Sequence, residues 1–373
     1  SSDRIPWRGR AGRYNPAILP RFTGAFCQDV SMTQIHVAVL GGGSFGTVIA
    51  NLAASNGNPT TLWLRDPQQL ADMRETQENT RYLPGFQLCP QLQFSDDLLA
   101  TVAQADLIFV SIPSKAFRSV LQAAKSALRP EQMLVSTTKG IEKGSFSLMS
   151  EILREETGLE RIGVISGPNL AKEIMSKQIA GTVVASHDED LRDTVHGVLS
   201  CPYFRVFSNT DVYGVELSGA LKNIYAVASG IAAAHKLGEN SRAMLLTRSL
   251  AEMSRFAVHL GANPLTFLGL AGVGDLIATC SSSLSRNYQV GFAIGQGQTL
   301  QEIVEELEQT AEGINTIEMV RHQADKLGIR MPLVSGLYEI IFNGRSLYDV
   351  VLAMMLASQS SDVEFVLPKP GEE

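Results

Sequence analysis

Short apolar runs alternate with amphipathic stretches through the first two hundred residues of the chain. The runs rich in β-branched residues, which we predict as strands, lie at 35–40, 60–64, 105–112, 133–138 and 162–166. The amphipathic stretches, which we predict as helices, lie at 47–55, 67–79 and 116–128. Strands that alternate with helices form parallel sheets, because each crossover places a helix on a face of the sheet. We therefore expect an α/β fold with a Rossmann-type, doubly wound parallel sheet.

The pattern changes near residue 209. Runs of β-branched residues become rare, and long stretches rich in Ala, Leu, Met and Glu follow at 217–234, 242–260, 300–307, 311–327 and 334–342. This composition predicts an all-α second domain, and a chain of 373 residues is long enough for two domains. We expect the Rossmann domain at 32–208, a helical domain that binds substrate at 209–358, and a tail at 359–373.

Residues 1–31 are rich in arginine and poor in acidic residues, with prolines at positions 6, 16 and 20. An arginine-rich transit-type leader is one interpretation of this segment. The other is a disordered or non-native extension upstream of a natural start at Met32. We favour the second, because these prolines interrupt the amphipathic helix of a targeting segment.

Composition limits the partners of the chain. A net charge of −7 argues against a broad nucleic-acid surface, although a local basic pocket could still bind a small phosphorylated ligand. No apolar run approaches the roughly 18 residues of a membrane span. The four cysteines have no C-x-x-C spacing and indicate neither a disulfide framework nor a metal site. We expect a cytoplasmic protein with no metal and no nucleic-acid or membrane partner.

A glycine pattern follows the first predicted strand and opens the first predicted helix. In Gly41-x-Gly43-x-x-Gly46, the first glycine permits a tight turn and the second lets the backbone approach a pyrophosphate. The third allows close packing of helix and strand. Free amides at the helix N-terminus bind phosphate, so the pattern predicts a dinucleotide site.

The second predicted strand ends in Arg65-Asp66. An acidic residue at this place usually binds the ribose 2′-hydroxyl of NAD, whereas an arginine can pair with the 2′-phosphate of NADP. Asp66 could serve NAD or only cap the next helix. We therefore expect NAD(H) and NADP(H) both to bind, with NADP(H) favoured.

Two lysines are candidate functional residues. Lys222 and its neighbour Asn223 lie in an apolar, small-residue stretch at 212–230, where an ammonium group needs a partner, a ligand or a chemical role. Lys139 leaves the end of a predicted strand directly into a glycine. Ligands of doubly wound sheets lie beyond such strand ends, although a lysine there can also be a solvated charge.

The helical half contains a second set of candidates. Residues 269–275 are rich in glycine and end in Asp275, and Ser285 precedes a predicted helix with Arg286 in its first turn. A helix N-terminus disfavours a cation, so Arg286 indicates either a bound phosphate monoester or a solvent-facing side chain on an ordinary capped helix. Cys280 has no activating base nearby in the sequence, and we expect it to serve in packing.

Six ordered motifs resemble bacterial NAD(P)-dependent glycerol-3-phosphate dehydrogenase over residues 35–356. They are Gly-x-Gly-Ser-x-Gly-Thr (41–47), Thr-Lys-Gly-Ile-Glu (138–142), Ser-Gly-Pro-x-x-Ala-x-Glu (166–173), Gly-Val-Glu-Leu-x-Gly-Ala-x-Lys-Asn (214–223), Gly-x-Gly-Asp-Leu-x-x-Thr-Cys (272–280) and Ser-Arg-Asn (285–287). The resemblance implies interconversion of dihydroxyacetone phosphate and sn-glycerol 3-phosphate, which in bacteria supplies phospholipid synthesis.

The resemblance also implies roles for individual residues. Lys222 would be the general acid/base, with Lys139, Asn223 and Asp275 orienting the reacting oxygen and the lysines. Substrate-binding residues would be Lys139, Gly167, Asn169, Lys222, Asp275, Ser285, Arg286 and Asn287, the last three at the phosphate. Cofactor-binding residues would be Gly41, Gly43, Ser44, Phe45, Gly46, Arg65, Lys139, Ala171, Arg286, Thr310 and Glu312. Position 45 is commonly Trp or Tyr in the family, and position 169 is often Ser or Thr.

Other functions share parts of this pattern. A hydroxyacid dehydrogenase or ketopantoate-type reductase also joins a Rossmann domain to a helical domain with a catalytic lysine, but the Ser285-Arg286-Asn287 phosphate site argues against both. A non-catalytic NAD(P)H-sensing module is a remote alternative, disfavoured by the presence of Lys139, Lys222 and Asp275. The apolar surplus of the helical half makes a homodimer plausible.

Overall fold

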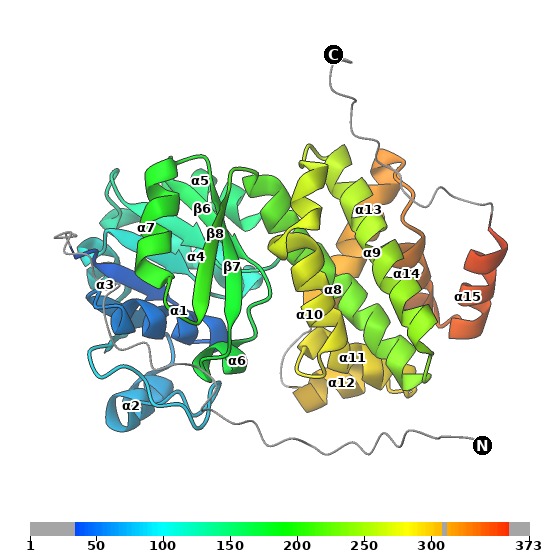
Figure 1. Ribbon diagram of the computed structural model, residues 1–373, viewed down its shortest axis with the longest axis horizontal. Coiled ribbons are helices and arrows are strands. Elements are labelled where there is room, and N and C mark those ends of the chain that lie inside the picture. Colours follow the sequence, from blue (N-terminus) through cyan, green and yellow to red (C-terminus); the bar gives the residue numbers. More distant parts are fainter. Residues whose placement is uncertain (1–33, 308–311, 358–373) are drawn as a thin grey trace, which may run out of the picture. The chain divides into compact units, whose positions relative to one another are not determined.

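The computed structural model describes residues 34–307 and 312–357, and the N-terminal extension, the C-terminal tail from 358 and Thr310 lie outside these ranges. Within the described residues, eight strands form one sheet in the order β3-β2-β1-β4-β5-β6-β7-β8. The strands are β1 (Val37–Leu40), β2 (Thr60–Trp63), β3 (Gln93–Ser95), β4 (Leu107–Val110), β5 (Met133–Ser136), β6 (Ile162–Ser166), β7 (Ala180–Ser186) and β8 (Phe204–Asn209). The predicted doubly wound sheet is therefore confirmed (Figure 1).

Helices cover both faces of this sheet. They are α1 (Ser44–Ser55), α2 (Pro67–Thr76), α3 (Leu98–Gln104), α4 (Ser114–Ala124), η2 (Lys125–Ala127), α5 (Met149–Thr157), α6 (Ala171–Met175) and α7 (Glu189–Leu199). Successive side chains of a strand point to opposite faces. Accordingly, Val37 and Val39 pack into the apolar cluster with α1 and α7, whereas Ala38 and Leu40 pack into the cluster with α4 and α5. Two apolar layers therefore bury the central strands completely.

One part of the sheet differs from the prediction, because β7 runs antiparallel to β6. The connection between them contains only the five-residue helix α6. Parallel neighbours are usually joined by a crossover helix that returns the chain along the sheet, and α6 is much shorter than helices such as α1 and α7. β7 therefore starts at the edge where β6 ends, and β8 pairs parallel to β7. The expectation of an all-parallel sheet was wrong here.

The second half of the chain is helical, as predicted. Its elements are α8 (Val212–Ala234), α9 (Glu239–His259), η3 (Pro264–Leu268), η4 (Leu270–Gly274), α10 (Asp275–Ser281), α11 (Arg286–Gly295), α12 (Leu300–Leu307), α13 (Glu312–Leu327), α14 (Pro332–Asn343) and α15 (Leu347–Leu356). The long helix α8 is buried over most of its length and packs against α9, α10, α11 and α13. Its small residues permit this, since a Cβ on Gly230 of α8 would lie 2.1 Å from the Tyr288 carbonyl oxygen of α11.

Across the described residues, no helix combines the length and apolar character that crossing a membrane requires.

Candidate active site

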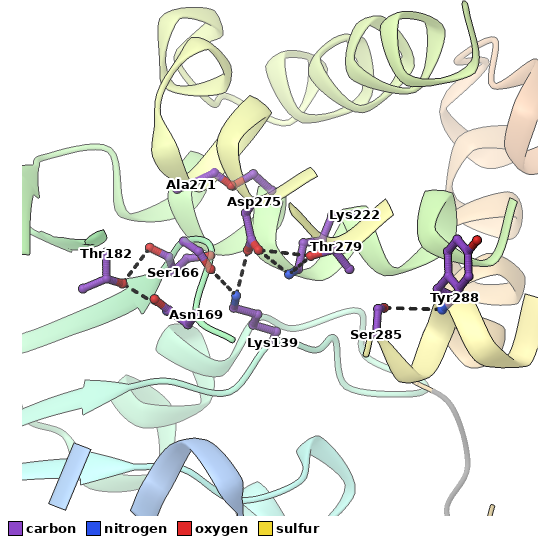
Figure 2. Close-up of polar contacts among 12 residues, drawn as sticks. Lys139, Ser166, Asn169, Thr182, Lys222, Ala271, Asp275, Thr279, Ser285 and Tyr288 are labelled. Carbon is purple, nitrogen blue, oxygen red and sulfur yellow. Dashed lines mark hydrogen bonds and ion pairs between the residues drawn. The ribbon is translucent and has the colours of Figure 1, made fainter. Parts of the chain in front are cut away.

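One carboxylate joins the two candidate lysines. Lys139 Nζ donates to Asp275 Oδ2 at 2.7 Å, and Lys222 Nζ donates to Asp275 Oδ1 at 2.5 Å (Figure 2). Lys139 follows β5 in the sheet, Lys222 lies in the middle of α8, and Asp275 is the first residue of α10. The fold thus brings three residues from distant parts of the chain to one point between the sheet edge and the helices.

This cluster is almost closed to solvent. Asp275 is 1% exposed, Lys222 is 6% exposed, and the Lys139 side chain is 18% exposed. Thr279, one turn after Asp275 on α10, accepts from Lys222 Nζ at 2.6 Å and donates to Asp275 Oδ1 at 3.2 Å. Thr279 was not among the predicted site residues, although its i+4 spacing from Asp275 places both side chains on one helix face.

The electrostatics of the cluster favour proton exchange. Burial lowers the pKa of Lys139 to about 8; the Asp275 carboxylate opposes this shift and the positive charge of Lys222 adds to it. A carboxylate shared between two lysines leaves the cluster with excess positive charge whenever both ammonium groups are protonated. Such a cluster is suited to stabilise negative charge that develops on a ligand oxygen.

The loop after β6 forms another wall of this site. Lys139 Nζ also donates to the Gly167 carbonyl oxygen at 2.8 Å. On the neighbouring strand β7, Thr182 Oγ1 accepts from Asn169 Nδ2 at 3.0 Å and donates to the Ser166 carbonyl oxygen at 3.2 Å. Asn169 Oδ1 and Ser166 Oγ are buried and have no hydrogen-bond partner among the described residues. Buried polar atoms of this kind are available to a polar ligand.

Thr182 was not among the predicted site residues, because neither strand β7 nor its pairing with β6 was predicted. Gly219 of α8 was likewise not assigned a role. A Cβ on Gly219 would lie 2.4 Å from Ser166 Oγ and 3.5 Å from Lys139 Cγ. Glycine at this position therefore lets α8, which carries Lys222, approach the edge of the sheet.

The loop that carries Lys139 is fastened to the sheet domain by an ion pair. Glu142, which ends the motif at 138–142, accepts from Arg118 Nε at 2.7 Å and from Arg118 Nη2 at 2.8 Å. Arg118 belongs to α4, and its hydrogen bonds lower the pKa of Glu142 to about 2. Bidentate pairs of this kind restrict orientation as well as distance, so the pair orders the segment that follows Lys139.

The predicted phosphate residues lie at the start of α11, as the sequence indicated. Ser285 is the N-cap, and its side chain accepts from the Tyr288 amide at 3.4 Å. Asn287 Oδ1 accepts from the Gly313 amide at 3.0 Å, which ties α11 to the first turn of α13. Glu312 in that turn accepts from Ser114 Oγ of α4 at 3.4 Å, so the helices also contact the sheet domain here.

Burial raises the pKa of Glu312, while the charge of Arg286 opposes the shift. Arg286 and Glu312, both predicted to contact the cofactor, are therefore electrostatic neighbours. Asn223 is buried beside Lys222 on α8. Cys280 packs in the apolar cluster around α8, where burial raises the pKa of its thiol to about 12. A thiol in that state is a packing residue rather than a nucleophile.

The glycine-rich turn fits a dinucleotide phosphate. Gly41 has φ +118°, and a Cβ on Gly46 would lie 2.1 Å from the Gly41 carbonyl oxygen. Gly43 caps α1 without any side-chain hydrogen bond, and a Cβ there would meet no atom within 4 Å. The helix start is thus open to an anion that can accept from its amides. Phe45 and Ala171 pack against the same apolar cluster as α1.

The acidic residue at the end of β2 takes part in capping the next helix. Asp66 caps α2, with Oδ1 accepting from the Gln68 amide at 2.9 Å and from the Gln69 amide at 3.3 Å. These amides, together with Arg81, lower the pKa of the Asp66 carboxyl group. Arg65 beside it is exposed. Among the described residues, no group of three or more His, Cys, Asp or Glu side chains could hold a metal ion.

Comparison with known proteins identifies the family. The sequence model for the N-terminus of NAD-dependent glycerol-3-phosphate dehydrogenase matches residues 36–192, and that for the C-terminus matches residues 211–352. This chain belongs to that family. It is 56% identical over 332 residues to glycerol-3-phosphate dehydrogenase [NAD(P)+] of Alcanivorax borkumensis, covering 89% of this chain and 97% of that relative.

Solved structures agree with the assignment to the glycerol-3-phosphate dehydrogenase family. The crystal structure of the Coxiella burnetii glycerol-3-phosphate dehydrogenase has a TM-score of 0.82 and 34% identity, covering 87% of this chain and 99% of that one. A ketopantoate reductase from Ralstonia eutropha has a TM-score of 0.55 and 17% identity, covering 82% and 97%, and shares the fold alone. The predicted family is confirmed, and the alternative of a ketopantoate-type reductase is not favoured.

Proposed function

We propose that this chain interconverts dihydroxyacetone phosphate and sn-glycerol 3-phosphate, with Lys222 as the general acid/base. The observation that carries the proposal is that one buried carboxylate, that of Asp275, accepts hydrogen bonds from both Lys222 and Lys139. A ligand oxygen placed beside these lysines would contact two proton donors whose positions are already set. Reduction of a ketone develops negative charge on its oxygen, and an adjacent ammonium group stabilises that charge and then donates the proton.

Each residue of the site has a separate role in the proposed reaction. The nicotinamide, when bound, supplies the redox chemistry at the carbinol carbon. Lys222 donates its proton to the substrate oxygen during reduction and takes it back during oxidation, while Asp275 keeps the ammonium group in place. Lys139 and Asn223 orient the same oxygen. Gly167 and Asn169 line the pocket through the loop after β6, where Asn169 Oδ1 has an open acceptor position.

Other residues would bind the cofactor and the phosphate group of the substrate. Gly41, Gly43, Ser44 and Gly46 would bind the pyrophosphate through α1, and both NADP(H) and NAD(H) are accepted, with NADP(H) preferred through Arg65. Phe45, Ala171 and Glu312 line the cofactor site. Ser285, Arg286 and Asn287 would bind the substrate phosphate, because a capped helix start and a guanidinium group together suit a phosphate monoester.

Steady-state kinetics test the phosphate assignment. Oxidation of NADPH is followed with dihydroxyacetone phosphate and with dihydroxyacetone, which lacks the phosphate, for the wild-type protein and Arg286→Ala. We expect Arg286→Ala to raise KM for dihydroxyacetone phosphate by about tenfold or more, since a charge-assisted hydrogen bond contributes about 1.5–3 kcal/mol. The wild-type protein should discriminate strongly between the two substrates. An unchanged KM in Arg286→Ala would refute the assignment.

A further inference from the structure

The segment after α2 closes over the glycine-rich turn. Asn79 Nδ2 donates to the Gly42 carbonyl oxygen at 2.9 Å and to Thr47 Oγ1 at 2.8 Å. Three residues after Asn79, the Tyr82 carbonyl oxygen accepts a second hydrogen bond from this turn, donated by Ser44 Oγ at 3.4 Å. Arg81 lies between these two attachment points, so the backbone that carries it is fixed beside the predicted phosphate site.

The Arg81 side chain is directed to the end of β2. Its Nη1 atom lies 2.9 Å from Asp66 Oδ2, and its guanidinium carbon lies 5.4 Å from the centre of the Tyr82 ring. The other oxygen of Asp66 accepts from two amides of α2. Both oxygens of the acidic residue at the end of the second strand are therefore engaged within the protein.

This arrangement bears on the choice of cofactor. A strand-end carboxylate usually accepts from the ribose 2′-hydroxyl, and the same carboxylate repels a 2′-phosphate. Arg81 balances the charge of Asp66, and exposed Arg65 adds a second guanidinium group at the same strand end. The Arg81 side chain is 55% exposed, so donors that do not contact Asp66 remain accessible to a ligand.

We propose that Arg81 is a specificity-determining residue for the 2′-phosphorylated cofactor: it neutralises Asp66 and donates to the 2′-phosphate. The proposal rests on the cofactor site given under the proposed function and adds a residue to it. Without Arg81, the Asp66 carboxylate is unpaired on its outer oxygen. The 2′-phosphate of NADPH then loses its attraction to Arg81 and is repelled by the Asp66 carboxylate. NADH carries an uncharged hydroxyl group at that position, so neither electrostatic change acts on it.

Direct binding measures this effect without turnover. Dissociation constants of NADPH and NADH are determined by titration calorimetry without substrate for the wild-type protein, Arg81→Ala and Arg81→Gln. We expect both variants to weaken NADPH binding by about tenfold, which corresponds to about 1.4 kcal/mol, and to change NADH binding by less than about threefold. Equal changes for the two cofactors, or no change for NADPH, would overturn the proposal.

A double variant separates neutralisation from simple contact. Asp66→Asn combined with Arg81→Ala removes the unpaired carboxylate, while asparagine still serves as an N-cap for α2. We expect it to recover part of the NADPH affinity lost in Arg81→Ala, and no recovery would contradict the neutralising role. Arg74→Ala is the matched control, because Arg74 on α2 donates to the Phe94 carbonyl oxygen instead. Since no substrate is present, the outcome is independent of the proposed dehydrogenase activity.

Discussion

Lys222 donates to Asp275 at 2.5 Å from the middle of a buried helix, 53 positions earlier in the chain. An isolated ammonium group in that helix would be costly to desolvate, and the carboxylate compensates for part of this cost. The second oxygen of Asp275 is occupied by Lys139, so the pair does not neutralise the site. Positive charge remains available to a ligand oxygen, which is the property that the proposed reaction uses.

Replacing the lysine of this pair tests the acid/base role. We expect Lys222→Met to lower kcat for reduction of dihydroxyacetone phosphate by about 10²–10⁴, because the proton donor is lost. Binding of NADPH should remain close to that of the wild-type protein. Lys143→Met, at an exposed lysine paired with Glu318, is the control and should retain full activity. A kcat within tenfold of the wild-type value in Lys222→Met would contradict the role.

Burial lowers the pKa of Lys139 and the Asp275 carboxylate opposes that shift, so both determine where the site titrates. Lys139 has a pKa of about 8, so its charged form predominates below that pH and is lost above it. If reduction needs that charge, kcat/KM should fall as the pH rises through about 8. Asp275→Asn removes the group that holds this pKa up, so the fall should move to lower pH and the maximal rate should decrease. A pH profile with an unchanged midpoint in Asp275→Asn would contradict this assignment.

Thr182 is expected to position the substrate loop. Thr182→Val leaves Asn169 Nδ2 without its acceptor and the Ser166 carbonyl oxygen without its donor. We expect KM for dihydroxyacetone phosphate to rise by about fivefold or more with little change in kcat, in line with about 1 kcal/mol per hydrogen bond. Thr182→Ser keeps the hydroxyl group and should restore KM. If the two variants behave alike, the hydroxyl group has no positioning role.

Glu252 of α9 is expected to stabilise the helical half. Glu252 is 1% exposed and accepts from the Leu333 amide at 2.8 Å and from the Val334 amide at 2.9 Å, at the start of α14. We expect Glu252→Ala to reduce the free energy of unfolding by about 2–4 kcal/mol, because two backbone amides at the start of α14, one of them fully buried, lose their acceptor. Thermal unfolding checks this, with Glu339→Ala on α14 as the control. A midpoint equal to that of the control would contradict the capping role.

Much of the fold could be predicted from hydrophobic pattern alone. The central strands were found because both of their faces are buried, which produces continuous apolar runs such as that of β4. β8 was missed, since its buried residues alternate with exposed ones such as Arg205 and Phe207. β3 was missed because it has only three residues, none of them buried. The direction of β7 depended on the length of α6, which the apolar pattern does not report.

Some features of the candidate site could likewise be predicted from the sequence, and others depend on the tertiary structure. Local sequence was sufficient for the glycine turn, the Ser285 cap and the unusual position of Lys222, because each depends on neighbours within a few residues. The pairing of Lys139 with Asp275 joins residues 136 positions apart, and the pairing of Arg81 with Asp66 depends on how the chain returns over the glycine turn. Such contacts arise only when the sheet and the helices pack, since charge pairing over long sequence separations carries no local signal.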